Sequence, residues 1–173
     1  RLKEALEPKL KNRKLEALFK NVELPLIKVL AHMERKGIYL DVPCLEKQKV
    51  TVNQEISSLS NEIYKLAGTE FNLNSPKQLS DILFNKLQIK PPKKTATGHS
   101  TNVEVLEFLK KEHPIAEKIL EYRTLEKLRS TYIEALPLEI NPKTKRIHCT
   151  FNQLGAATGR LSCQDPNLQN IPI

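Results

Sequence analysis

Residues 43–67 read PCLEKQKVTVNQEISSLSNEIYKLA and contain neither proline nor glycine after the first position. Apolar side chains recur in this stretch at steps of three, four and seven residues, at Leu45, Val52, Ile56, Leu59, Ile63 and Leu66. That spacing puts them on one face of a helix as a heptad seam. The stretch therefore predicts a long amphipathic helix of about 37 Å, at 1.5 Å per residue, which ends at Gly68.

A second stretch, residues 114–136, has the same character. Its apolar stripe comprises Ile115, Ile119, Tyr122, Leu125, Leu128, Tyr132 and Leu136. Two long amphipathic helices separated by a compact insertion, residues 69–113, most simply pack as an antiparallel hairpin. Shorter helices are expected over about 12–21, after a looser start, and over 24–36, where Gly37 supplies the stop.

The pattern changes after Pro137. Residues 146–153 alternate and include β-branched and aromatic side chains, which predicts a strand. A second strand is expected near residues 159–162. The predicted fold class is mainly α, and α+β overall. It consists of a long antiparallel helical hairpin, a small helical insertion at its tip, and a short antiparallel β segment at the C-terminal end.

The insertion contains two helix starts, each written as a capping box, at Ser75 to Gln78 and at Thr101 to Glu104. Between them, residues 88–100 carry lysines and hydroxyls but no acid. Helix N-termini offer free N–H groups and partial positive charge, which suits phosphate. Ordinary capping explains the same residues, so phosphate contact and simple capping remain equal alternatives.

Charge narrows the class of partner. The chain of 173 residues has a formal net charge of +8, and only 5% of its residues are aromatic, with no tryptophan. Clustered positive charge suggests a polyphosphate partner, although basic residues also merely solubilise loops. The shortage of aromatic residues argues against a single-strand platform built on base stacking and favours duplex backbone contact.

The cysteines and the hydropathy bear on location and metals. The three cysteines, Cys44, Cys149 and Cys163, lack metal-ligand spacing and are odd in number, which suits a reducing cytoplasm. No apolar run approaches the length of a membrane span, so no membrane partner is expected. Aspartates are few and scattered, so no catalytic residue and no metal site is predicted in the chain itself.

The last seventeen residues form a segment rich in hydrogen-bond donors, with one carboxylate, Asp165. Arg160, Asn167, Gln169 and Asn170 supply donors of the kind that reach the minor-groove acceptors shared by all base pairs. An Asx-type turn with a surface arginine is the alternative that composition alone favours.

Two motifs in this segment resemble a known family. TGRLS (residues 158–162) and DPNLQNIP (residues 165–172) resemble the primer-template-binding motif of family A DNA polymerases, the bacterial DNA polymerase I type. Residues 24–41, 68–75 and 122–132 resemble the family's thumb. The resemblance implies that residues 1–22 are the tail of an exonuclease-like domain or a linker. It makes residues 23–140 the thumb, with its tip insertion at about 69–113, and residues 141–173 the start of the palm.

The resemblance also implies which residues contact DNA. We expect contacts to primer-template duplex at Asn72, Asn74, Ser75, Lys94, Ser100, Thr101, Arg129, Thr158, Arg160, Asn167, Gln169 and Asn170. By the same resemblance, the parent enzyme is a DNA-directed DNA polymerase of replication and repair, a monomer that uses Mg²⁺ and deoxynucleotide triphosphates. Its metal-binding aspartates are expected beyond Ile173, so this chain alone should bind duplex weakly and incorporate no nucleotide.

One alternative comes from a different class. The same heptad seam suits a free-standing helical module that binds a protein or a nucleic acid and has no enzymatic role. Continuation of the reading frame into a short acidic strand would favour the polymerase.

Overall fold

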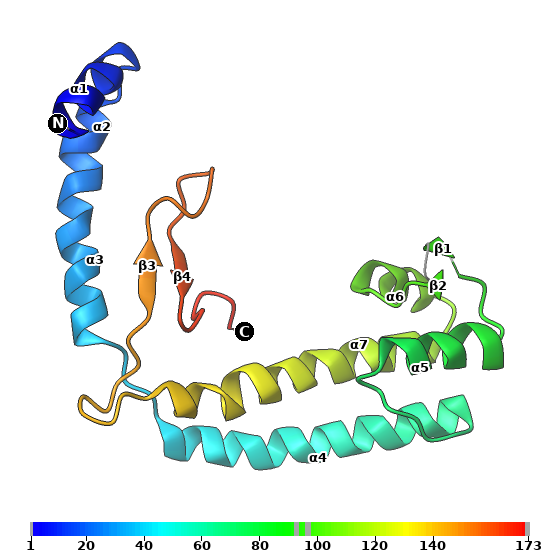
Figure 1. Ribbon diagram of the computed structural model, residues 1–173. Coiled ribbons are helices and arrows are strands. Elements are labelled where there is room, and N and C mark those ends of the chain that lie inside the picture. Colours follow the sequence, from blue (N-terminus) through cyan, green and yellow to red (C-terminus); the bar gives the residue numbers. More distant parts are fainter. Residues whose placement is uncertain (1, 92–93, 96–97, 172–173) are drawn as a thin grey trace. The chain divides into compact units, whose positions relative to one another are not determined.

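The fold is described from a computed structural model, which covers residues 2–91, 94–95 and 98–171 (Figure 1). In chain order the helical elements are α1 (Leu2–Asn12), α2 (Glu16–Leu18), the π-helical η1 (Phe19–Glu23), α3 (Leu24–Lys36), α4 (Val42–Ala67), α5 (Pro76–Ser80), the π-helical η2 (Asp81–Lys86), α6 (Val103–Leu109), α7 (Pro114–Lys127), the π-helical η3 (Leu128–Glu134) and the 3₁₀ turn η4 (Leu136–Glu139). The strands are β1 (Lys94–Thr95), β2 (Gly98–His99), β3 (Thr150–Asn152) and β4 (Ser162–Gln164). The predicted fold class, mainly α with a short antiparallel β segment near the C-terminal end, is confirmed.

The chain divides into two compact units. One comprises Arg1–Asp41 together with Leu136–Ile173, and the other comprises Val42–Ala135. The boundaries expected at residues 22 and 140 differ from this division. The reason is that α3 is bonded to the C-terminal segment: Ile38 pairs with Ile147, and Glu34 accepts from the backbone N–H of Phe151. The roles assigned to the segments remain predictions.

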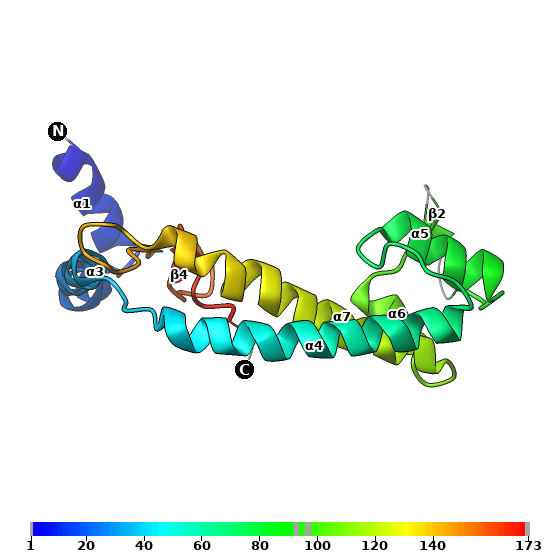
Figure 2. The ribbon, with the colours of Figure 1, turned by 90° about the horizontal axis from the view of Figure 1, so that it is seen from below.

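The second unit is built on the hairpin of α4 and α7, which lie side by side in both views (Figure 1, Figure 2). Ion pairs fix their direction, because Lys49 contacts Glu134 near one end and Lys118 contacts Glu62 near the other. Residue numbers thus increase along α4 in the direction in which they decrease along the partner helix, so the two helices are antiparallel, as expected.

The predicted seam of α4 is correct up to its last position. Val52, Ile56, Leu59 and Ile63 are buried, but Leu66 is 46% exposed and Ala67 takes its place in the core at 2%. An α-helix turns every 3.6 residues, so a strict heptad drifts off the buried face over several turns. The step of four from Ile63 to Ala67 corrects that drift.

The second predicted helix is interrupted. It continues from α7 into η3, which has π geometry, and then into η4. A π turn inserts an extra residue and rotates the side chains that follow. Accordingly Ile133, which was not in the predicted stripe, is buried. Leu128 is half-buried at the edge of the core, as is Leu125, which lies before the π turn.

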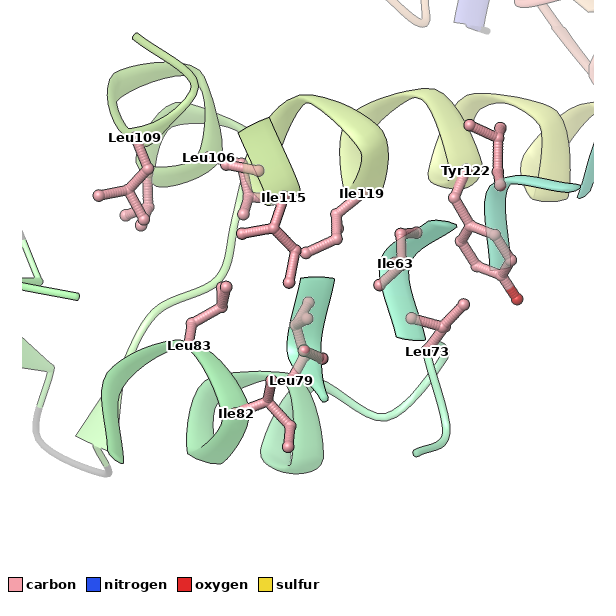
Figure 3. Close-up of a cluster of buried hydrophobic side chains, with 14 of the residues drawn as sticks. Ile63, Leu73, Leu79, Ile82, Leu83, Leu106, Leu109, Ile115, Ile119 and Tyr122 are labelled. Atoms are coloured by element: carbon pink, nitrogen blue, oxygen red, sulfur yellow. The ribbon is translucent and has the colours of Figure 1, made fainter. Parts of the chain in front are cut away.

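The tip insertion packs on the same core. Leu73, Leu79 and Leu83 from the α5–η2 side, and Leu106 and Leu109 from α6, meet Ile63 and Ile119 of the hairpin (Figure 3). Leu79, Leu83 and Leu106 are fully buried. The insertion is therefore held by apolar burial, which is the largest favourable term in folding.

The first unit departs from the predictions at its start. Residues expected to be loose form α1, which continues through Pro8, and the break comes at residues 13–15, where Lys14 has φ 57°. Proline removes one N–H from the helix but does not end it here. The expected helix over 12–21 is divided into α2 and η1.

Gly37 ends α3, as predicted, with φ 67°. Beyond it, Ile38 exchanges two backbone hydrogen bonds with Ile147, at 2.8 and 2.9 Å. A Cβ on Gly37 would lie 2.8 Å from the carbonyl oxygen of Ile147 and 2.7 Å from Cε1 of His148. Glycine is required here for both the positive φ and the close approach.

The C-terminal strands pair in antiparallel register, with Phe151 opposite Cys163. They are β3 and β4, which are shorter than expected and begin later in the chain. The shift arises because residues 153–159 form turns, with Gly159 at φ 79°, so pairing begins only at Ser162.

Candidate nucleic-acid interface

The tip of the second unit carries a cleft of about 1490 Å³. It is lined from both predicted helix starts, by Ser75 to Gln78 on one side and by His99 to Asn102 on the other, and by Arg123 of α7. The two helix starts therefore lie in the same part of the molecule, as the sequence predicted. Glu70, Asp81, Lys77 and Arg123 line the cleft together, so side chains alone do not make it strongly positive.

The first start is capped by Ser75, whose hydroxyl accepts from the backbone N–H of Gln78 at 3.4 Å. The second half of the expected capping box is not formed. The Oε1 of Gln78 instead accepts from the N–H of Asn72 at 2.7 Å, and the N–H of Ser75 donates to the carbonyl of Asn72. Gln78 therefore shapes the loop that precedes the helix.

The second start is capped by Asn102 rather than Thr101. The Oδ1 of Asn102 accepts from the N–H of Val105 at 3.0 Å, and the hydroxyl of Ser100 accepts from the N–H of Asn102. Thr101 is 6% exposed, and both its carbonyl and its hydroxyl accept from the guanidinium of Arg123. Burial lowers the pKa of Arg123 below its ordinary value. Thr101 thus anchors the second start to α7.

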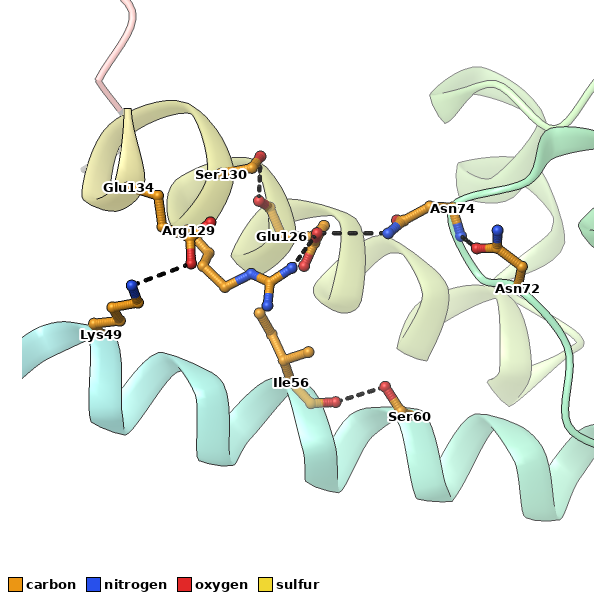
Figure 4. A network of polar contacts seen from close by, with 9 residues as sticks. All are labelled: Lys49, Ile56, Ser60, Asn72, Asn74, Glu126, Arg129, Ser130 and Glu134. Carbon is orange, nitrogen blue, oxygen red and sulfur yellow. Dashed lines mark hydrogen bonds and ion pairs between the residues drawn. The ribbon is translucent and has the colours of Figure 1, made fainter. Parts of the chain in front are cut away.

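Asn74 and Arg129 both bond to Glu126 of α7, and Asn72 bonds in turn to Asn74 (Figure 4). The Oε1 of Glu126 accepts from Nη2 of Arg129 at 2.6 Å and from Nδ2 of Asn74 at 3.5 Å. The hydrogen bond to Glu126 is the main cause that raises the pKa of Arg129. Asn72 accepts from the N–H of Asn74 at 2.9 Å. In this conformation these side chains bond to one another, but Oε2 of Glu126 and Nε of Arg129 have no partner among the described residues.

The remaining predicted tip residue is Lys94. Its backbone pairs with His99 in the ribbon of β1 and β2, which the sequence did not predict. The side chain of Lys94 lies outside the part of the chain that the structure describes. Contact between DNA and these tip residues therefore stays a prediction.

The C-terminal loop of the first unit, residues 153–171, presents a different picture. Arg160 is exposed, and within the described part of the chain it has no hydrogen bond or ion pair. Thr158 and Gly159 beside it are exposed as well, and a Cβ on Gly159 would meet nothing within 4 Å. The guanidinium is therefore available to an external acceptor.

Gln169 has another role. Its Oε1 accepts from the N–H of Cys163 at 3.0 Å, and its Nε2 donates to the carbonyl of Leu161 at 3.0 Å. The Oδ1 of Asn167 accepts from the N–H of Gln169 at 3.0 Å. Gln169 thus holds the loop against β4, and it does not offer its amide outward here. Asn167 and Asn170 are exposed.

Sequence reasoning missed Glu126, which organises the tip, and assigned Gln78 a different role there. A signal for Glu126 was present, because it stands three residues before Arg129, the spacing of neighbours on a helix surface. Its contact to Asn74, 52 residues away, left no local signal. Gln78 was recognised, but as half of a capping box.

Among the described residues, 2–91, 94–95 and 98–171, no group of three or more histidine, cysteine or acidic side chains could hold a metal ion. No helix in the same ranges is long and apolar enough to cross a membrane.

Comparison with known proteins gives consistent matches. A family model described as DNA polymerase family A matches residues 42–173, more than half of the chain. The chain is 50% identical over 175 residues to the thermostable DNA polymerase I of Thermus filiformis, covering 100% of this chain and 21% of that protein. It is 47% identical over 172 residues to DNA polymerase I of Geobacillus stearothermophilus, covering 99% and 20%.

A solved structure agrees with these relatives. It is the POL domain of Pol1 from M. smegmatis in complex with DNA primer-template and dNTP, with a TM-score of 0.82 and 38% sequence identity. The match covers 98% of this chain and 30% of that one. The chain spans about one fifth of the length of the curated relatives named above.

Proposed function

The chain belongs to DNA polymerase family A, and from that premise we propose that it forms the thumb and the start of the palm of a DNA-directed DNA polymerase. Its task is to hold primer-template duplex during replication and repair. The thumb corresponds to residues 23–140 and the palm entry to residues 141–173. The similar polymerase domain from M. smegmatis, which was solved with primer-template, supports the assignment of the chain to the DNA-holding part of a polymerase.

The exposed guanidinium of Arg160 carries the proposal. It stands on an exposed loop of a chain that resembles a polymerase domain solved with primer-template, and no described side chain neutralises it. Arginine donates to the purine N3 and pyrimidine O2 acceptors that all correct base pairs place alike in the minor groove. Asn167 and Asn170 add exposed amide donors nearby in the chain, and Gln169 keeps the loop in place.

The tip grips the backbone rather than the bases. The first turns of α5 and α6, at Ser75 and Asn102, bring backbone N–H groups to one cleft, and Lys77 adds an exposed cation. Phosphate contacts of this kind fix position without reading sequence. Ser100 and Thr101 contribute by shaping the second start.

Chemistry at the primer end requires groups that the described residues do not gather. Family A polymerases join nucleotides with divalent metal ions, and Mg²⁺ and deoxynucleotide triphosphates belong to the proposed parent activity. The described residues of this chain offer no cluster of three metal ligands. The part of the activity proposed for this chain is the binding of duplex.

The remaining parts of the proposal concern state and setting. All three cysteines are free thiols, which suits a reducing cytoplasm. A single copy presents both the tip and the loop, so we propose a monomer. A free-standing interaction module without enzymatic role is disfavoured, because the family model covers residues 42–173.

Duplex binding by the 173-residue chain tests the proposal. Fluorescence anisotropy with a dye-labelled primer-template duplex, and with the labelled primer strand alone, gives both dissociation constants at about 50 mM salt. We expect tighter binding to the duplex, and a log-log salt dependence with a slope of about −0.9 per phosphate contacted. Equal binding of both DNAs, or binding that is insensitive to salt, would contradict the proposal.

A further inference from the structure

We propose that Glu126 is a positioning residue, which holds the tip loop, residues 72–75, against α7 in the conformation that presents the start of α5 to DNA. The inference rests on the proposed function, since it concerns how the chain grips a duplex. The carboxylate itself does not contact DNA.

Contacts on one oxygen atom carry the proposal (Figure 4). Oε1 of Glu126 accepts from Arg129 on its own helix at 2.6 Å and from Asn74 of the tip loop at 3.5 Å. The side chain of Glu126 is 16% exposed. A mostly buried carboxylate thus joins the loop to the hairpin across 52 residues of sequence.

Asn74 also bonds to the side chain of Tyr122 on α7, whereas the remaining polar bonds of the tip loop are local. Asn72 accepts from the N–H of Asn74 at 2.9 Å and from the N–H of Ser75 at 2.9 Å, and Gln78 accepts from the N–H of Asn72 at 2.7 Å. These bonds join residues at most six apart, so they set the shape of the loop but not its place on α7. Leu73, at 5% exposure, packs into the core, but apolar contact has no direction. Asn74 and Glu126 supply the direction.

The network is an unusual one to retain for stability alone. Oε2 of Glu126 and Nε of Arg129 are buried and have no partner within the described ranges. Burying a charge is costly unless its hydrogen bonds are satisfied, and apolar residues often serve stability better. Because this network buries unpaired polar atoms at a cost in stability, its best explanation is that it positions the tip loop.

The sign of one mutational effect separates positioning from simple charge. Glu126→Gln removes a negative charge from a surface that is proposed to meet phosphates, so electrostatics alone predicts tighter binding. A positioning role predicts the opposite, because the amide cannot hold Arg129 and Asn74 as the carboxylate does.

The experiment compares Glu126→Gln with Glu117→Gln in the 173-residue chain. Glu117 is exposed on the same helix and has no bonded partner among the described residues, so it matches the change in charge. Anisotropy with labelled primer-template duplex should show that Glu126→Gln weakens affinity about five- to tenfold, as expected when a charge-assisted hydrogen bond becomes a neutral one. Glu117→Gln should bind as tightly as wild type, or slightly more tightly. Unchanged or tighter binding by Glu126→Gln would overturn the inference.

A readout without DNA keeps the two proposals apart. Hydrogen exchange of the free chain should be faster at the amides of Asn74 and Ser75 in Glu126→Gln, while Val105 in α6 keeps its wild-type rate. If each of the three amides exchanges at the same rate in Glu126→Gln as in wild type, the inference is wrong, whether or not the chain binds duplex. Should Glu126→Gln not fold, Asn74→Ala, a change at an exposed loop residue, must itself weaken duplex binding and speed exchange at Ser75. If the wild-type chain does not bind duplex, but exchange in Glu126→Gln is faster than in wild type at Asn74 and Ser75 alone, the proposed function is rejected and the positioning role is retained.

Discussion

The tip and the C-terminal loop were both expected to contact DNA, yet they use their polar side chains in opposite ways. At the tip, Asn72, Asn74, Thr101 and Arg129 bond to other residues of the protein. On the loop, Arg160 is exposed and unpaired among the described residues. The tip, whose polar side chains are bonded internally, presents a fixed shape and backbone N–H groups to a ligand, whereas the loop presents a side chain. The difference suits the two tasks proposed for these regions, holding the backbone and contacting the minor groove.

The largest expected difference between the two regions is in how much their leucines contribute to stability. Leu79 is fully buried there, whereas Leu154 of the C-terminal loop is 91% exposed. Leu79→Ala should lower the free energy of unfolding by about 2–5 kcal/mol, through lost burial and a cavity. Leu154→Ala should change it by less than about 0.5 kcal/mol. Urea unfolding followed by circular dichroism measures both, and similar losses would contradict the contrast.

Glycines provide the next test, within the first unit. Gly37→Ala introduces a Cβ that meets Ile147 and His148 at 2.7–2.8 Å and forces a non-glycine residue to φ 67°. We expect a loss of about 2–4 kcal/mol of stability from strain and displacement. Gly159→Ala has the positive φ but open space, so its loss should be about 1 kcal/mol. Equal losses of stability would mean that the close approach of Gly37 to Ile147 and His148 does not contribute to the cost of Gly37→Ala.

Two arginines sharpen the comparison directly. Arg160→Ala should weaken duplex affinity by about 1–3 kcal/mol and leave the unfolding midpoint unchanged. Arg129→Ala should lower stability by about 1–3 kcal/mol, because it leaves the mostly buried Glu126 without its cation. Anisotropy and urea unfolding on both variants decide this, and a reversed pattern would refute the assignment of the two roles.

The smallest expected effect is a pH dependence at Cys149. Burial, followed by the hydrogen bond to Cys163, raises the pKa of the Cys149 thiol from 9.0 to about 11. Below pH 9 the thiol is protonated in both states, but between pH 9 and 11 it ionises mainly in the unfolded chain. Stability should therefore fall as pH rises, by about 1 kcal/mol at pH 10. Urea midpoints at pH 8.5 and 10 measure it, and Cys149→Ala should show a correspondingly smaller fall. Equal falls would contradict the raised pKa.

Sequence periodicity was sufficient for the scaffold. The seam of α4 and the stripe of α7 recur at helical spacing, so both helices and their antiparallel packing were predictable. The π geometry of η3 and the late start of β4 were not, because each depends on tertiary packing or on turns that override local propensity.

The candidate site divides along the same line. The exposure of Arg160 agrees with the expectation from its contiguous motif, because exposure requires no distant partner, and its contact with DNA stays a prediction. The bonds of Asn74 to Glu126 and of Arg123 to Thr101 join residues 52 and 22 positions apart. No local pattern encodes such pairs, so residues predicted as DNA contacts proved to be engaged within the protein. Lys94 remains a prediction, since its side chain lies outside the described part.

Hydrogen exchange of the 173-residue chain, with and without saturating primer-template duplex, tests the central claim most directly. The account predicts slower exchange in two segments, residues 74–80 at the start of α5 and residues 157–162 around Arg160, with α4 between residues 50 and 60 unchanged. Duplex that is fully bound yet protects neither segment would contradict it.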